Sequence, residues 1–180
     1  MKKLKSMFLM AALMGALSLS AGVSPHETVS ATIGGNKVSI TYGRPYAKKP
    51  GTEEVRKIWG GLVPNGAAWR MGADQATTLE TEKAVVIGGL EVPAGKHTLY
   101  MVLDAKGEAK LAVSNTTGQW GVPVDEKHDL GRVDMKKAEA SENLGQFTIT
   151  IGPGKGAGEI LAAWEKTTYS VAIATKDAAK

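Results

Sequence analysis

Two arginines, Arg44 and Arg70, are the charged side chains best suited to specific recognition in this sequence. A guanidinium group presents a planar set of donors that matches a carboxylate through two parallel hydrogen bonds. If both arginines line an open pocket with Trp59 and Asp74, the site suits an anionic small molecule or the carboxylate of a peptide. The structural alternative, which we favour, is an ion pair that ties a long loop to the body of the fold, with Asp74, Glu80 or Glu82 as the partner.

The four tryptophans divide by their surroundings. Trp69 and Trp164 lie among apolar residues of strand-like segments, so we expect both in the core. Trp59 and Trp120 lie beside glycines in two irregular segments, where an indole ring can stack on a sugar or a peptide. A tryptophan in such a place can equally close the open end of a β-sandwich, and the sequence leaves both roles open.

The histidines do not form a metal-binding pattern, because no two of His26, His97 and His128 have the close spacing of ligands on one element. Segment 125–129 packs three carboxylates and an imidazole together, which favours a solvated loop over a calcium or zinc site. His26 beside Glu27 could act as a ligand or a base if the N-terminal segment folds over a pocket, but a surface polar pair is the simpler interpretation. We therefore assign no metal site and no cofactor, and keep a metal-binding envelope protein as a weaker third interpretation.

Recognisable catalytic motifs are missing from the sequence. It contains no cysteine, which excludes disulfides and thiolate chemistry, and no Gly-x-Ser-x-Gly motif. The glycine-rich run 152–158 fails as a phosphate-binding loop, because Lys155 is followed by Gly156 rather than by Ser or Thr. A convergent triad or a pair of carboxylates needs no sequence motif, so a hydrolase stays an alternative.

The segments that must position these side chains are short and strand-like. In segments 36–42, 146–151 and 168–173 apolar residues alternate with polar ones, which predicts half-buried antiparallel strands. Glycines separate many such segments, as in the tight hairpin turn predicted at 34–35. The pattern is typical of an all-β domain.

We expect about nine or ten strands and two long irregular segments, 44–64 and 118–131. Long loops at one end of a β-sandwich are where binding residues usually lie. Segment 159–166 is the one stretch with helical character, although we expect it to be a strand that contains Trp164.

The N-terminal 22 residues have the pattern of a secretory signal peptide, with three lysines, an apolar run from Met7 to Leu19 and small residues at 20–22. Without this leader 158 residues remain, with 19 basic and 18 acidic side chains, so the net charge of +4 falls to +1. That balance argues against a nucleic-acid partner. No second apolar run is long enough to span a bilayer. We therefore expect a periplasmic or secreted protein.

Six blocks of the sequence carry a family resemblance. They are Ser24-Pro25-His26 and the stretches 40–45 (ITYGRP), 56–64 (RKIWGGLVP), 68–78 (AWRMGADQATT), 86–95 (VIGGLEVPAG) and 118–121 (GQWG). In this order they resemble the bacterial secreted domain-of-unknown-function family numbered 2911, over nearly the whole chain after the leader. The resemblance implies a fold and export but no reaction, so it transfers no catalytic residues. Two features depart from the family pattern: Asp74 stands where Asn is more common, and segment 47–54 is longer than usual.

These observations predict a single antiparallel β-sandwich over residues 23–175, followed by a polar tail at 176–180. We expect an exported protein of unknown function that acts as a non-catalytic binding or interaction module at the cell envelope. Its partner would be a small molecule, a glycan or an envelope protein, and the candidate ligand-binding residues are Trp59, Trp120, Arg44, Arg70, Asp74 and His26. The alternative, a hydrolase acting on an envelope glycan or peptide, requires His26 or His128 within hydrogen-bond reach of a carboxylate in a concave pocket.

Overall fold

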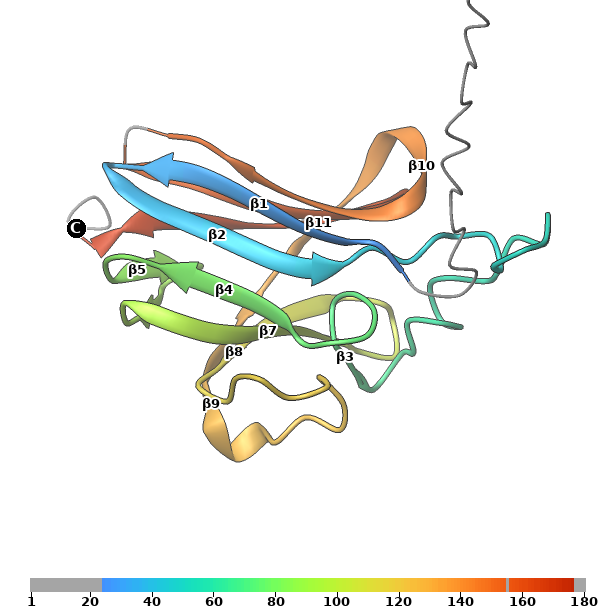
Figure 1. Cartoon of the computed structure of the whole chain (residues 1–180), viewed down its shortest axis with the longest axis horizontal. Helices are drawn as coiled ribbons and strands as arrows, with labels where there is room; N and C mark the ends of the chain where they lie inside the picture. The colour runs from blue at the N-terminus through green and yellow to red at the C-terminus, as the bar shows by residue number, and fades with distance from the viewer. Residues whose placement is uncertain (1–23, 155, 177–180) are drawn as a thin grey trace, which may run out of the picture.

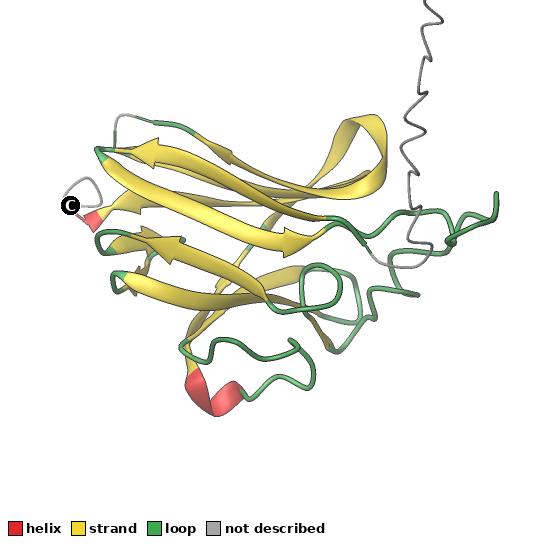
Figure 2. Cartoon of the chain, in the orientation of Figure 1, coloured by secondary structure: helices red, strands yellow, loops and turns green. Residues whose placement is uncertain are grey.

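The computed structural model describes residues 24–154 and 156–176 of the chain. The predicted signal peptide, and all but the first residue of the predicted tail, lie outside the described residues. Within them the chain forms eleven strands and one short 3-10 helix (Figure 2). The elements are β1 (His26–Ile33), β2 (Asn36–Gly43), β3 (Ala68–Trp69), β4 (Thr77–Thr81), β5 (Val85–Ile87), β6 (Leu90–Val92), β7 (Gly95–Leu103), β8 (Ala109–Ser114), η1 (Glu126–His128), β9 (Asp129–Asp134), β10 (Lys136–Gly152) and β11 (Ala157–Thr175).

Two antiparallel sheets make up the fold. The larger sheet has the strand order β1-β2-β4-β7-β8-β9, with β3 pairing on β7, and the smaller has the order β10-β11-β5-β6. Figure 1 shows the long hairpin of β10 and β11 running alongside β1 and β2. The predicted all-β sandwich is confirmed. The strand count slightly exceeds nine or ten, because an element as short as β3 has no detectable periodicity.

Alternation determines which face of each strand enters the core. In β2 the side chains of Val38, Ile40 and Tyr42 are buried, while the alternate residues Lys37 and Thr41 are exposed. Successive side chains of a strand point to opposite faces of its sheet, so one face packs inward and the other meets water. The tight turn predicted at 34–35 joins β1 to β2 in full register.

The two longest strands, β10 and β11, form the C-terminal hairpin. Segment 159–166 lies within β11, so the predicted strand containing Trp164 is confirmed and the helical alternative is wrong. The residue pattern does not predict the first half of β10, residues 136–145. That half is mostly exposed and lacks the apolar alternation by which a strand is recognised.

An aromatic cluster joins the two sheets in the core. Trp69 of the larger sheet stacks on Trp164 of the smaller, with ring centroids 6.0 Å apart, and packs edge-on against Phe147 at 4.9 Å. Both tryptophans are buried, as the sequence predicts. Large aromatic side chains contribute much of the burial energy in a core, so we expect this cluster to dominate the packing between the sheets.

The chain crosses from one sheet to the other directly after β2. The Phe147 N–H of β10 donates to the Pro45 carbonyl (2.9 Å), and the Ala47 N–H donates to the Gly145 carbonyl (2.8 Å). Residues 45–47 therefore lie against β10 before the chain enters the long segment that leads to β3. This crossing places the start of that segment at one end of the sandwich (Figure 1).

A pair of tryptophan variants tests this assignment of the core. Trp164→Ala is expected to lower the free energy of unfolding by about 3–5 kcal/mol, because it empties a fully buried site. Trp120→Ala, at a side chain that is 59% exposed, should cost less than about 1 kcal/mol. Urea denaturation followed by circular dichroism measures both, and equal losses would contradict the packing described here.

Candidate functional site

A hollow of about 950 Å³ opens at the end of the sandwich where β2 stops. We call it the end hollow. Its lining comes mainly from residues 24–25, the crossing segment 45–56, the turn 69–74 and Trp120. Segments far apart in the sequence thus meet around one concave surface.

Exposed apolar side chains gather at the end hollow. Five large hydrophobic side chains of the described residues are substantially exposed, and three of them line it: Tyr46 (49%), Leu62 (40%) and Trp120 (59%). The mostly buried Trp69 also contributes to the lining. Isolated exposed apolar residues are common on protein surfaces, but a group of them around a concavity is typical of a binding site.

The four described arginines fall into two classes. Arg44 and Arg132 form ion pairs with carboxylates and do not line the end hollow. Arg56 and Arg70 line it, and across residues 24–154 and 156–176 neither has a carboxylate within ion-pair distance. The positive charges of these two side chains are therefore available to a ligand.

Arg70 also positions Trp120. Its Nη1 donates to the Trp120 carbonyl (3.1 Å) and to the Asp74 carbonyl. A Cβ added at the neighbouring Gly121, whose φ is +97°, would lie 3.1 Å from the Arg70 Cβ and 3.0 Å from the Ala76 Cα. This close approach needs glycine, and it holds the Trp120 loop against the turn 69–74.

Asp74 supplies the carboxylate of the end hollow. Its Oδ2 is buried and has no hydrogen-bond partner among the described residues. His26 Nε2 lies 4.0 Å from this oxygen, outside hydrogen-bond distance, and His26 is not part of the lining. His128 Nδ1 lies 3.1 Å from Asp125 Oδ2, a hydrogen bond in which the carboxylate accepts, but this pair is exposed and is not part of the lining of the end hollow. The hydrolase interpretation requires a histidine that is within hydrogen-bond reach of a carboxylate and lies in a concave pocket. Neither histidine meets both conditions.

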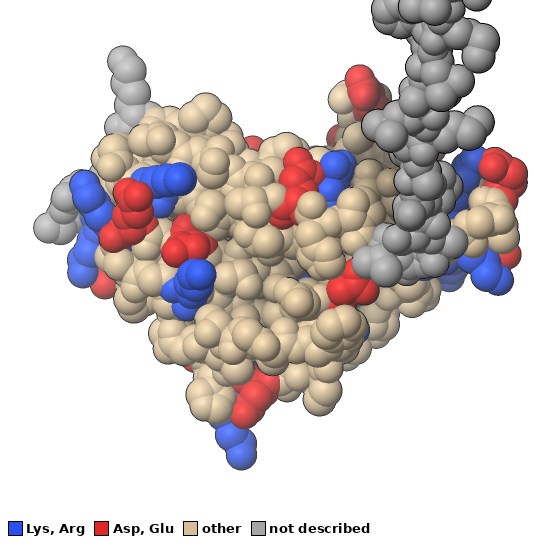
Figure 3. Space-filling view, viewed as in Figure 1, with Lys and Arg blue, Asp and Glu red and all other residues tan. Residues whose placement is uncertain are grey.

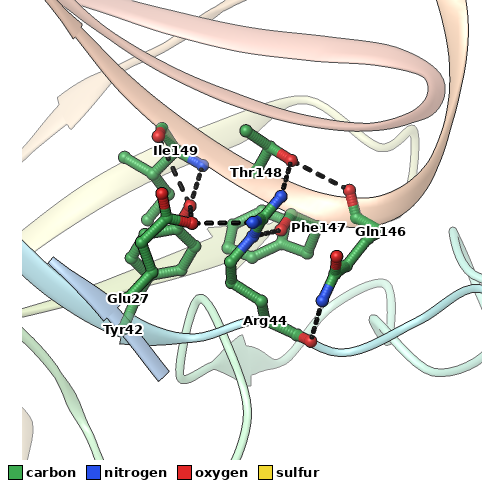
Figure 4. Close-up of polar contacts among 7 residues, drawn as sticks. All are labelled: Glu27, Tyr42, Arg44, Gln146, Phe147, Thr148 and Ile149. Carbon is green, nitrogen blue, oxygen red and sulfur yellow. Dashed lines mark hydrogen bonds and ion pairs between the residues drawn. The ribbon is translucent and has the colours of Figure 1, made fainter. Parts of the chain in front are cut away.

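Arg44 joins the sheets instead of lining the end hollow (Figure 4). Its Nη1 lies 2.8 Å from Glu27 Oε2 on β1, Nε donates to the Phe147 carbonyl (3.2 Å) and Nη2 donates to Thr148 Oγ1 (2.9 Å) on β10. An ion pair of this structural kind is the favoured sequence-based interpretation, but its expected partners, Asp74, Glu80 or Glu82, are wrong. The alternation of β1 does not reveal that Glu27 reaches across to the crossing segment.

Trp59 closes the core rather than facing the end hollow. Its ring packs 5.1 Å from Tyr169 and 6.4 Å from Trp69, and its Nε1 donates to the Trp164 carbonyl (3.4 Å). Of the two roles that the sequence leaves open, these contacts give Trp59 the packing role. The ring of Trp120 is exposed instead and lines the end hollow.

The end hollow thus brings together three of the six predicted residues, Trp120, Arg70 and Asp74. Sequence reasoning missed Tyr46 and Arg56. Each had a usable signal, because both lie in or beside the blocks that carry the family resemblance, within a long irregular segment. Nothing in their local pattern shows that this segment turns back toward Arg70.

A second polar cluster fixes the 115–128 loop to the outer face of the larger sheet. Tyr100 donates to Asp129 Oδ2, and Arg132 Nε donates to the same oxygen (3.1 Å) while Arg132 Nη2 pairs with Glu126 (2.8 Å). Burial and the hydrogen bond to Asp129 raise the pKa of Tyr100 to about 12. Arg132 is the cation among these carboxylates. Within the described ranges no three His, Cys, Asp or Glu side chains are grouped to hold a metal ion.

The family assignment follows from a comparison with protein-family models. Residues 24–173 match the model described as a protein of unknown function, DUF2911. The chain belongs to this family. No curated protein and no solved structure matches the chain. Because the matched range begins at Ser24 and ends in β11, the DUF2911 domain comprises both sheets and every segment that lines the end hollow.

Acidic and basic side chains are interspersed on the face shown in Figure 3, without a large patch of one sign. In the part of the chain that the structure describes, no helix has the length and apolar character needed to cross a membrane.

A double-mutant cycle tests the structural role of Arg44. Arg44→Ala should lower the free energy of unfolding by about 2–3 kcal/mol, because it removes two hydrogen bonds to β10 as well as the pair with Glu27. The cycle with Glu27→Gln should give a coupling energy of about 1 kcal/mol, since both side chains are partly exposed.

The exposed pair Lys96–Glu80 (3.5 Å) is the matched control, and its coupling should stay below about 0.5 kcal/mol. Urea unfolding of the single and double variants gives all the values. A coupling for Arg44 and Glu27 no larger than the control's would show that the pair does not hold the crossing.

Proposed function

We propose that this DUF2911 chain is an exported, non-catalytic binding module of the cell envelope, and that the end hollow receives its ligand. The observation that carries the proposal is the combination in one concavity of exposed aromatic rings, Tyr46 and Trp120, with two arginines that have no carboxylate partner among the described residues, Arg56 and Arg70. Ligand pockets typically combine an apolar wall with a few convergent polar groups.

Export rests on the leader-like residues 1–22, whose lysines, apolar run and small residues fit a cleavable signal peptide. Cleavage there would leave the two sheets intact, because β1 begins at His26. A periplasmic or secreted location also fits a chain without cysteine, which needs no particular redox state to fold.

The hydrolase alternative has weaker support. A general base needs hydrogen-bond reach of the group that it activates or of the carboxylate that orients it. The 4.0 Å separation between His26 and Asp74 is the nearest approach to such an arrangement at the end hollow. Among the described residues no Ser or Thr hydroxyl of the lining is hydrogen-bonded to a histidine or a carboxylate. The contacts support recognition better than bond cleavage.

A thermal-shift screen tests the binding proposal. A ligand that binds only the folded chain at a hundredfold excess over its dissociation constant stabilises it by about 2.7 kcal/mol, which raises the melting temperature by several degrees. The panel contains glycans, peptidoglycan fragments, peptides and divalent metals. We expect a shift with a glycan or a peptide, and we expect Trp120→Ala to remove it without lowering the melting temperature of the free chain much.

Val55→Ala is the matched control. Val55 is also 59% exposed on the crossing segment, but it does not line the end hollow, so this variant should keep the shift. A shift that survives Trp120→Ala, or a panel without any shift, would contradict the proposal.

A further inference from the structure

The charges around the end hollow favour an anion. Lys48 and Lys49 also line it, but they pair with Glu53 and Glu54 of the same segment. The uncompensated cations are therefore the two guanidinium groups. Arg56 is held in place by a bond from Nη2 to the Tyr46 carbonyl, and its Nε is buried without a hydrogen-bond partner among the described residues.

A guanidinium group that lacks a carboxylate partner gains a charge-assisted hydrogen bond when a ligand anion binds to it. A guanidinium matches the planar, two-oxygen geometry of a carboxylate best. Arg56 and Arg70 line the end hollow without a carboxylate partner among the described residues, and thus point to a ligand that carries a carboxylate.

Asp74 adds a second requirement to the ligand. Its side chain lines the end hollow and is 30% exposed, and the carboxylate can only accept a hydrogen bond when ionised. An anion without N–H or O–H groups would bring a second negative charge beside this carboxylate and leave it unsatisfied. A ligand rich in hydroxyl groups would satisfy it.

The exposed rings add a third requirement, a flat apolar face. Trp120 and Tyr46 are about half exposed or more in the free chain. An indole ring offers a large flat surface that gains energy when a complementary face covers it. The C–H face of a sugar ring is such a face, and it leaves the hydroxyl groups at the ring edge free for Asp74.

We propose that the ligand of the end hollow is an acidic saccharide, a sugar ring that bears a carboxylate. The inference rests on the proposed function and names the chemical class of its ligand. Arg56 and Arg70 bind the carboxylate, Trp120 stacks on the ring and Asp74 accepts from a hydroxyl. A volume of about 950 Å³ accommodates one or two sugar rings.

A peptide fits the lining less well. Extended peptides gain much of their affinity by adding a strand to an exposed sheet edge. The end hollow is lined mostly by loop residues, and of the strands only β3 and β10 contribute, through Trp69 and Gly145. The loops offer side chains rather than a ladder of backbone groups.

The test compares sugars that differ only in the carboxylate. N-acetylmuramic acid is titrated against N-acetylglucosamine, and glucuronic acid against glucose, with the binding of each measured by calorimetry on the purified protein. We expect the acidic member of each pair to bind at least about tenfold more tightly, as the loss of a charge-assisted hydrogen bond implies. This preference should shrink as salt concentration rises.

Variants assign the effect to the arginines. Arg56→Gln should weaken binding of the acidic sugar at least about tenfold and leave the neutral sugar unchanged. Arg70→Gln should do the same, but it also loosens the Trp120 loop, so its melting temperature is measured alongside. Lys96→Gln removes one positive charge from an exposed site outside the end hollow and should change neither affinity.

Each outcome separates this inference from the proposed function. Equal affinity for acidic and neutral sugars would overturn the inference while the binding function stands. Tighter binding of a peptide with a free carboxyl terminus than of any sugar would overturn it in favour of a peptide ligand. Binding of none of these probes, together with no shift in the wider screen, would reject the proposed function as well.

Discussion

The crossing of the chain from one sheet to the other depends on the guanidinium group of Arg44. It pairs with Glu27 on β1 and donates to two acceptors on β10, so one side chain links the edge strands of both sheets. Backbone hydrogen bonds then carry Pro45 and Ala47 along β10. Because Tyr46 lies between these two residues, the position of an aromatic wall of the end hollow follows directly from the crossing.

In the binding function that we propose, the same residue types serve structure and recognition in separate places. Arg44 and Arg132 are each surrounded by acceptors from other elements, whereas the side chains of Arg56 and Arg70 bond only to backbone carbonyls. Trp69 joins the core to the lining, so the aromatic cluster between the sheets also supports the site. A rigid core beneath a loop-built concavity keeps the recognition groups in place at little entropic cost on binding.

Periodicity is enough to predict most of the strands but not the site. The alternation of Val38, Ile40 and Tyr42 indicates burial directly, and the burial of Trp164 in β11 follows from the apolar residues around it. The partner of Arg44 and the contribution of Arg56 to the end hollow depend on which segments meet in space. The sequence around these two arginines does not show which segments these are. The exposed first half of β10 is not predicted for a related reason. A strand without a buried face has no alternation of apolar and polar residues in its sequence.

We propose that the arginines and tryptophans divide into a structural group and a recognition group. A nuclear magnetic resonance titration of the isotopically labelled protein with N-acetylmuramic acid tests this division most directly, through the side-chain N–H signals of both residue types. We expect shifts at Trp120, Arg56 and Arg70, with Arg44 and Trp59 unchanged. Shifts at Arg44 and Trp59 that leave Trp120 and Arg56 unchanged would contradict this division.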